Sequence, residues 1–358
     1  MHFLKTGGVV LGLVVILALF LAIRVFPDRQ NSTTKVASST QKQTLSTQSH
    51  QVKLSGKVLF IGDIMLARTI GDGIVTGQNP FVHVQSILNS YDLRVANIET
   101  TIADPSVAHQ VAGKLYTFNA PLQAIQTLKI AGINVADLAN NHTRDFGPAA
   151  TSDMITRLEN AGIKVVGAGD NLDQAFTPLV VDVSVSSTGE KTQTVKIGIV
   201  AVNSIENYVT NPTSSQAGSA FFDKDRILQE IKTARSEGAD IVVVFPHWGT
   251  EYQTTPNSDQ VSWGHFFIDS GADIVIGSHP HVIQTTETYN GKYIVYSLGN
   301  FIFDGMGGNA LNGQMIGLDL SLKGTVDSNG VLQNKVVYLG APNAIPIHID
   351  SQGFPEPQ

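Results

Sequence analysis

From residue 56 onward the sequence alternates short apolar runs with segments of helical length. The apolar runs are rich in Val, Ile and Leu and cover residues 58–61, 93–96, 133–139, 241–245 and 274–276. The helical segments cover residues 121–131, 149–161, 223–237 and 261–270. Alternation of buried strands with helices is typical of α/β organisation. The pattern predicts an α/β (α+β) domain over residues 56–350, followed by a tail over residues 351–358.

Two stretches indicate that the sheet is not purely parallel. Residues 179–185 and 194–202 read as strands and flank the turn sequence Ser187-Thr-Gly-Glu-Lys, which predicts an antiparallel hairpin. A second strand-rich stretch, interrupted by glycine turns, covers residues 292–350. We therefore expect a mixed sheet or two packed sheets.

Composition excludes several classes of protein. The chain contains no cysteine, which excludes a disulfide framework, a thiol nucleophile and zinc ligation by thiolates. Its 15% charged residues and 33 glycines favour a loop-rich globular protein over a disordered or coiled-coil chain. The net charge of −7 does not favour a nucleic-acid-binding protein, so no nucleic acid is expected as a partner.

The amino-terminal part differs from the rest in hydropathy. After a short tail over residues 1–6, residues 7–26 form an apolar stretch whose only charge is Arg24. Twenty residues of helix span the hydrocarbon core of a bilayer. The alternative is a cleaved signal peptide, but its apolar region is normally shorter and ends at a small-x-small site, which this chain lacks. We expect an uncleaved, single-pass transmembrane anchor.

The segment that follows the apolar stretch, residues 27–55, is predicted to be a flexible linker. Between residues 30 and 55, 17 of 26 positions are Ser, Thr, Gln or Asn, and there is no acidic or aromatic residue. Such a composition buries too little apolar area to offset the entropy of ordering. Residues 1–55 carry a net charge of +5 and residues 56–358 a net charge of −12. Because long domains cross the membrane largely regardless of flanking charge, we expect the acidic domain to be extracellular.

Each of five apolar runs is followed by a side chain that can bind a metal ion. Ligands of open α/β sheets bind beyond the carboxyl ends of the strands. Carboxylate and amide oxygens together with imidazoles suit divalent cations. The set predicts one or two cations, with one bridging carboxylate, bound by Asp63, Glu99, Asn141, His247, His279 and His281.

Taken singly, most of these residues have simpler explanations. An Asp at a strand end is usually a helix cap or turn residue, and Asn140-Asn141 reads equally well as a turn. The pair His279-Pro280-His281 points more strongly to a metal, since two imidazoles so close rarely serve packing alone. His265 is expected to pack on a helix, and His83, His109 and His348 are assigned no chemistry.

In chain order, these residues resemble the calcineurin-like metallophosphoesterase signature. The chain more closely resembles the CapA family of poly-γ-glutamate capsule synthesis proteins, over about residues 56–305. The pieces that carry the resemblance are Gly62-Asp63-Ile64-Met65-Leu66-Ala67-Arg68, Asn97-Ile98-Glu99, Asn140-Asn141-His142, His247-Trp248-Gly249, Gly277-Ser278-His279-Pro280-His281 and Ser297-Leu298-Gly299-Asn300-Phe301. The resemblance implies a four-layer αββα sandwich in a membrane-anchored extracytoplasmic protein that works beside a membrane polymer synthase.

The resemblance also implies roles for individual residues. Asp63 and His281 would bind one metal, and Asn141, His247 and His279 the other, with Glu99 as the bridge. His142 would be the catalytic residue that faces the substrate as general acid or oxyanion partner. The ligands suit manganese, iron or zinc without selecting one. Substrate contacts are expected from Arg68, Asn97, Asn140 and Asn300.

The sequence departs from the general phosphoesterase pattern at two positions. Met65 stands where that pattern has a histidine, and Glu99 stands where it has a bridging aspartate. The first metal would then have only Asp63, Glu99 and His281 as protein ligands, which leaves a single-metal centre, a weakly filled site and an open catalytic position as alternatives.

Three functional hypotheses follow. The first is a membrane-anchored factor for the synthesis or export of poly-γ-glutamate, with that anionic polymer and the synthase subunits as partners. The second is an extracellular metal-dependent phosphodiesterase that acts on wall polymers or nucleotides. The third is a binding module that keeps the fold without catalysis, so the sequence leaves enzymatic activity open.

Overall fold

The computed structural model describes residues 49–205 and 211–358. The predicted anchor over residues 7–26 and most of the predicted linker lie outside the described residues. Among the residues that are described, no helix is both long enough and apolar enough to cross a bilayer.

The first sheet has nine strands and is built around β1 (His50–Ile64). β1 pairs in antiparallel fashion with β14 (Asn312–Val326) and in parallel fashion with β2 (Leu93–Ile98). The strand order is β17-β16-β14-β1-β2-β3-β4, with β13 beside β1 and β15 beside β14. The remaining strands are β3 (Val135–Asp137), β4 (Lys164–Val166), β13 (Asn300–Ile302), β15 (Leu332–Leu339), β16 (Asn343–Ile349) and β17 (Pro355–Pro357).

The second sheet has six strands in the order β11-β12-β10-β9-β7-β6. Its members are β6 (Leu179–Val185), β7 (Gln193–Asn203), β9 (Ile241–His247), β10 (Ile274–Ile276), β11 (Thr286–Tyr289) and β12 (Lys292–Val295). β6 and β7 form the predicted antiparallel hairpin, whereas β7, β9, β10 and β12 are parallel. A two-stranded sheet joins β5 (Ala168–Gly169) to β8 (Gly218–Ser219).

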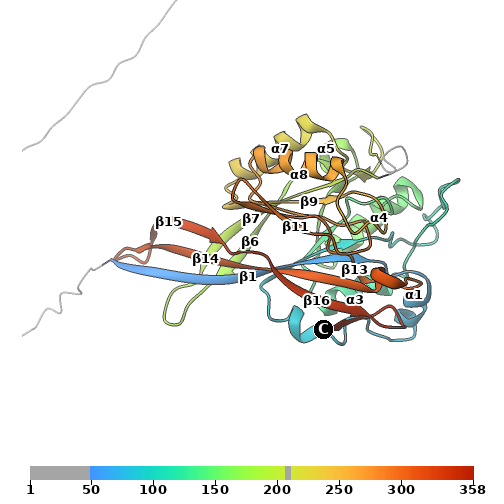
Figure 1. Ribbon diagram of the computed structural model, residues 1–358, viewed down its shortest axis with the longest axis horizontal. Coiled ribbons are helices and arrows are strands. Elements are labelled where there is room, and N and C mark those ends of the chain that lie inside the picture. Colours follow the sequence, from blue (N-terminus) through green and yellow to red (C-terminus); the bar gives the residue numbers. More distant parts are fainter. Residues whose placement is uncertain (1–48, 206–210) are drawn as a thin grey trace, which may run out of the picture. The chain divides into compact units, whose positions relative to one another are not determined.

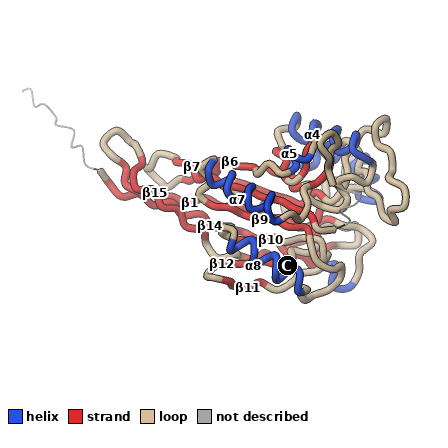
Figure 2. Tube along the Cα trace, turned by 90° about the horizontal axis from the view of Figure 1, so that it is seen from above, coloured by secondary structure: helices blue, strands red, loops and turns tan. Residues whose placement is uncertain are grey.

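Helices cover the outer faces of both sheets. α1 (Arg68–Val75), α3 (Gln123–Ala131) and α4 (Gly147–Asn160) pack on the first sheet. α7 (Lys224–Ser236) and α8 (Ser258–Asp269) pack on the second, and in the view from above α7 lies along its strands (Figure 2). The short helices are α2 (Gln85–Leu88), α5 (Leu172–Ala175) and the 3-10 turn η1 (Gly308–Leu311).

Buried apolar side chains form three clusters, because successive residues of a strand point to opposite faces of its sheet. Leu59 and Ile61 of β1 face the α1–α3–α4 layer, while their neighbours Val58 and Phe60 face the other sheet. Strand β9 behaves in the same way, with alternate residues facing α7 and α8 or the space between the sheets. Because successive strand residues point to opposite faces, each sheet buries both of its faces where helices cover it. The order of layers is helices, sheet, sheet, helices (Figure 1), which is the αββα arrangement.

Two boundaries differ from the sequence-based expectation. β1 begins at His50, ahead of Gly56, and pairs with β14 from its first residue. Val52 and Leu54 are buried there, because they alternate with exposed polar residues in a composition otherwise typical of a linker. Residues 351–358 are likewise not a free tail, since β17 pairs with β16 and Phe354 is buried.

Candidate metal centre

Strand pairing brings the polar strand ends of both sheets together. Within the first sheet, Asp63 lies opposite Asn97, which in turn lies opposite Asp137. Between β9 and the loop after β10, His247 forms a bridge with Ser278. β1 also passes β13 so closely that a Cβ on Gly62 would lie 2.2 Å from the carbonyl oxygen of Gly299. Only glycine fits at this crossing, immediately before Asp63.

Asn141, His247 and His279 form one compact group of donors. Nε2 of His247 lies 2.9 Å from Oδ1 of Asn141 and 3.1 Å from Nδ1 of His279. Burial lowers the pKa of both histidines well below the usual value, and the neighbouring imidazoles lower it further. Both rings are therefore neutral near pH 7, which is the state that binds metals. Donors about 3 Å apart match the separation of ligands on one ion with bonds of about 2.1 Å.

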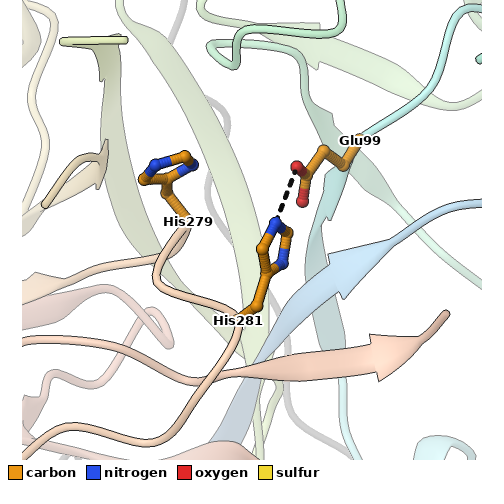
Figure 3. A group of neighbouring side chains, drawn as sticks. All are labelled: Glu99, His279 and His281. Atoms are coloured by element: carbon orange, nitrogen blue, oxygen red, sulfur yellow. Dashed lines mark ion pairs between the residues drawn. The ribbon is translucent and has the colours of Figure 1, made fainter. Parts of the chain in front are cut away.

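Asp63 and His281 form the second group. Oδ2 of Asp63 lies 3.3 Å from Nδ1 of His281, and Oδ1 of Asn300 lies 2.8 Å from the same nitrogen. The other nitrogen, Nε2, points to Glu99 (Figure 3). Burial by itself would lower the pKa of His281, but the carboxylates of Glu99 and Asp63 raise it to about 10.

Glu99 lies between the two groups and lacks hydrogen-bond partners. Its Oε1 is 3.7 Å from His281, 3.8 Å from His142 and 3.9 Å from His247, measured to Nε2 of each ring. Neither carboxylate oxygen accepts a hydrogen bond, although the side chain is fully buried. Burial raises the pKa of Glu99 well above its usual value. A buried carboxylate without partners is costly, and a cation would supply the missing partner.

Glu99 belongs to both of the candidate metal-ligand groups at this site. One comprises Glu99, His279 and His281, and the other comprises Asp63, Glu99 and His247, so each combines residues from both of the groups described above. The donor atoms within each group lie within 4.8 Å of one another. The residues therefore fit a divalent metal centre of one or two ions, and the bridging role of Glu99 stays a prediction.

His142 is held at the edge of the centre by a buried carboxylate. Its Nδ1 lies 2.8 Å from Oδ2 of Asp145, which leaves Nε2 directed toward Glu99. Asp145 also accepts from the backbone N–H of Phe118 at 2.7 Å and from Nζ of Lys114 at 2.5 Å. The ring of Phe118 packs on His142 with centroids 4.3 Å apart. Burial lowers the pKa of His142, and the hydrogen bond to Asp145 partly opposes this effect.

The three asparagines expected to contact substrate lie beneath the ligands. Asn97 donates to Oδ1 of Asp63 at 2.8 Å, and Asn140 donates to Oδ1 of Asn97 at 2.9 Å. Asn300 contacts both Nδ1 and the carbonyl oxygen of His281. All three side chains are fully buried. Their contacts position metal ligands, and a direct substrate contact remains a prediction.

Arg68 lies at the rim of the centre rather than inside it. Its guanidinium pairs with Asp304 and lies over the rings of Phe118 and Phe303, at 5.4 and 6.0 Å. The ring of Phe303 is 5.1 Å from that of His281. Arg68 also lines a cavity of about 700 Å³ between α1 and the start of α3. The ring of Phe303 thus lies between Arg68, which lines this open cavity, and the predicted ligand His281.

Comparison with known proteins decides the family. The family model described as bacterial capsule synthesis protein PGA_cap matches residues 57–305. The chain belongs to this capsule synthesis family. All six predicted ligands and His142 lie inside the matched region.

Two relatives in the capsule synthesis family are similar to this chain over about two thirds of its length. The chain is 31% identical over 253 residues to "Capsule biosynthesis protein CapA" of Bacillus anthracis, covering 68% of this chain and 59% of that protein. It is 31% identical over 249 residues to "PGA biosynthesis protein CapA" of Bacillus subtilis, covering 68% and 62%. The chain thus spans about three fifths of the length of these relatives. Calcineurin-like phosphoesterase YfkN of Bacillus subtilis aligns at 12% identity with a TM-score of 0.48, covering 81% of this chain and 91% of that structure.

Two positions where this capsule-family chain departs from the phosphoesterase pattern have a structural explanation. Met65 is fully buried in the apolar layer next to α1, and its sulfur accepts the N–H of Ala67 at 3.1 Å. It therefore serves packing. The extra methylene of Glu99 places its carboxylate close to three histidines at once.

Sequence reasoning missed Asp145, Lys114 and Ser278 as parts of the site. Asp145 follows His142 by three residues, a spacing that could have indicated an orienting carboxylate. Ser278, whose Oγ lies 3.0 Å from Nδ1 of His247, belongs to the motif around His279 and His281, but nothing in the sequence assigned it a role. Lys114 carries no local signal, since only the folding of a distant loop brings it to Asp145.

Proposed function

We propose that this protein is a membrane-anchored, extracellular factor for synthesis or export of a poly-γ-glutamate capsule, and that its metal centre binds the anionic polymer. Family membership supports the biological role, and the names of two relatives refer to capsule or PGA biosynthesis. The observation that carries the metal centre is Glu99, a buried carboxylate with no hydrogen-bond partner and three imidazoles around it.

The residues at the centre fit one or two divalent cations. Asp63 and His281 would bind one ion, Asn141, His247 and His279 the other, and Glu99 would be shared. Bound cations would supply positive charge and lower the pKa of a coordinated water. Manganese, iron and zinc all suit this ligand set.

Charge at the site supports a role for the metal in binding an anion. Residues 56–358 carry a net charge of −12, which repels an anionic polymer. Lys114 and Arg68 are basic side chains beside the centre, and each is paired with an aspartate. Bound cations reverse the local sign of the potential. Polymer binding is therefore expected only in the metal-loaded protein.

The membrane location rests on the apolar stretch over residues 7–26. A single span there would place the acidic domain outside the cell, next to the subunits of a membrane polymer synthase. The basic residues between the span and β1 would lie near anionic lipid or wall.

The capsule role is tested in the bacterium that makes the protein. Replacing the gene with a copy that carries Glu99→Gln and His279→Ala should reduce the amount or length of surface poly-γ-glutamate as strongly as deletion of the gene. A copy carrying His265→Ala, outside the centre, serves as the control. Unchanged polymer after complete deletion would overturn the proposal.

A second candidate function is hydrolysis of phosphodiesters. The observation that favours it is His142, whose Nδ1 is fixed by Asp145 while Nε2 is directed toward the centre. A general acid requires this placement. The full chain with manganese should then cleave aryl phosphodiesters, and His247→Ala should abolish cleavage. Equal rates for the two proteins would exclude this activity.

A further inference from the structure

Backbone strain is concentrated around the metal centre. Among the described residues, the non-glycine residues with positive φ are Arg68, Tyr252, His279, His281, Asn290 and Asn334. Asparagine tolerates this conformation, so the two asparagines need no further explanation. Strained conformations at other residue types persist where the surrounding structure enforces them, and they cluster at functional sites. His279 and His281 are predicted ligands, whereas Tyr252 has no role so far.

Tyr252 is fixed to the loop that carries both histidine ligands. Its φ is 62°, and its backbone N–H donates to the carbonyl oxygen of Pro280 at 2.8 Å. The centroid of its ring is 6.0 Å from that of His281. Nevertheless, 54% of Tyr252 is exposed. A large aromatic ring is thus held beside the centre with much of its surface open to a ligand.

Tyr116 belongs to the long loop between β2 and α3 (Figure 1). Lys114, on one side of it, donates to Asp145 and to the carbonyl oxygen of Asn141, and Phe118, on the other side, packs on His142. Tyr116 itself is 63% exposed. Burial and Glu251 raise the pKa of Tyr252, and nearby Tyr116 raises it further. Tyr116 is thus flanked by residues that contact Asn141 and His142, and Tyr252 is held beside His281.

We propose that Tyr116 and Tyr252 form a clamp at the mouth of the metal centre that binds the backbone of a γ-linked glutamyl chain. This inference rests on the proposed function. Phenols offer flat apolar faces together with an uncharged hydrogen-bond donor. A γ-linked chain has two methylenes per residue in its backbone, which pack on aromatic faces. Its carboxylates branch directly from that backbone, so one can reach the cations while its neighbours accept hydrogen bonds from the phenols.

The alternative occupant is a polyol phosphate chain. Its backbone is more densely charged for its apolar surface, and Glu251 beside Tyr252 adds negative charge to the mouth. A glutamyl chain therefore fits the uncharged clamp better. Binding of a polyol phosphate chain instead is one of the outcomes that the test distinguishes.

The test is a binding titration with the full chain in detergent, loaded with manganese. The probe is a fluorescently labelled γ-linked glutamate decamer, compared with an α-linked decamer and with a glycerol phosphate oligomer. Tyr252→Ala and Tyr116→Ala should each weaken binding of the γ-linked decamer about tenfold, without change in manganese content. Tyr252→Phe and Tyr116→Phe should weaken it less, because the ring remains. Tyr338→Ala, at an exposed position on β15, is the control and should bind as wild type does.

The outcomes separate the clamp from the proposed function. If the wild type binds the γ-linked decamer and both alanine variants bind it equally well, the clamp is wrong and the proposed function stands. The clamp is also wrong if Tyr338→Ala is equally impaired, or if only the glycerol phosphate oligomer depends on the two tyrosines. If the manganese-loaded wild type does not bind the γ-linked decamer at all, both proposals fail.

Discussion

Glu99 directs Oε1 to within 3.7 Å of Nε2 of His281, yet neither oxygen of Glu99 accepts a hydrogen bond. A carboxylate buried this completely is normally paired, because desolvation of an unpaired charge is expensive. Glu99 is instead surrounded by imidazole nitrogens at distances too long for hydrogen bonds. The arrangement leaves room between the carboxylate and the rings for a bound cation.

The first prediction concerns the charge of Glu99. Glu99→Gln keeps the shape of the side chain but removes its negative charge, so manganese should bind at least about tenfold more weakly. Metal content of the purified full chain, measured by mass spectrometry after dialysis against a fixed manganese concentration, checks this. Glu237→Gln, at the exposed end of α7, is the matched control. Equal metal content in the two variants would remove Glu99 from the ligand set.

The second prediction separates two adjacent asparagines. Asn141 offers Oδ1 to the group around His247, whereas Asn140 makes four hydrogen bonds that hold the loop. Asn141→Ala should lower manganese affinity while changing stability little. Asn140→Ala should lower the free energy of unfolding by at least about 2 kcal/mol, because it leaves buried groups unpartnered. Titrations with manganese and with urea measure the metal affinity and the free energy of unfolding of both variants. If Asn140→Ala lowers manganese affinity and Asn141→Ala lowers stability, the two roles are exchanged.

Much of the site could be predicted because parallel strands impose a simple geometry. Each of the apolar runs identified in the sequence coincides with a strand or with part of one, and the polar residue after it lies at the shared edge. Asp63, Glu99 and His247 follow this rule directly. His279 and His281 needed the additional signal of two imidazoles flanking a proline.

The remainder of the site and fold depends on contacts between distant segments. Lys114 reaches Asp145 through a loop with no periodic pattern, so its role had no local signal. The strand character of residues 50–55 was hidden for a related reason. Only Val52 and Leu54 carry the two-residue period, and β14, more than two hundred residues later, supplies their partner.

The third prediction follows from the early start of β1. A chain that begins at residue 56 lacks the part of β1 that pairs His50 with Val326 through Ser55 with Ser321. It also loses the buried side chains of Val52 and Leu54, each worth about 1.5–3 kcal/mol when fully buried. We expect it to be at least about 3 kcal/mol less stable than a chain that begins at residue 47. Urea unfolding of both fragments checks this, and equal midpoints would mean that the first strand residues contribute no stability.

The fourth prediction concerns pH and Glu230, a buried carboxyl on α7 outside the metal centre. Its Oε2 has no hydrogen-bond partner, and burial raises its pKa well above the usual value despite the opposing effect of Arg226. In the unfolded chain this carboxyl ionises near its ordinary pKa of about 4.3. Between that pH and its raised pKa, the folded state binds more protons than the unfolded state, so its contribution to stability falls as pH rises.

Glu230→Gln removes this contribution, so the free energy of unfolding of the variant should depend less on pH than that of the wild type. Near pH 4 the variant and the wild type should have similar free energies of unfolding, because both side chains are neutral. By pH 8 the variant should be more stable by about 1–3 kcal/mol, since the wild type must keep a carboxyl protonated or bury an unpartnered charge. Urea unfolding of the full chain in detergent at pH 4, 6 and 8 measures the difference, with the exposed Glu237→Gln as control. A constant difference across this range would mean that Glu230 ionises in the folded protein as it does in the unfolded chain, through water or a cation that reaches α7.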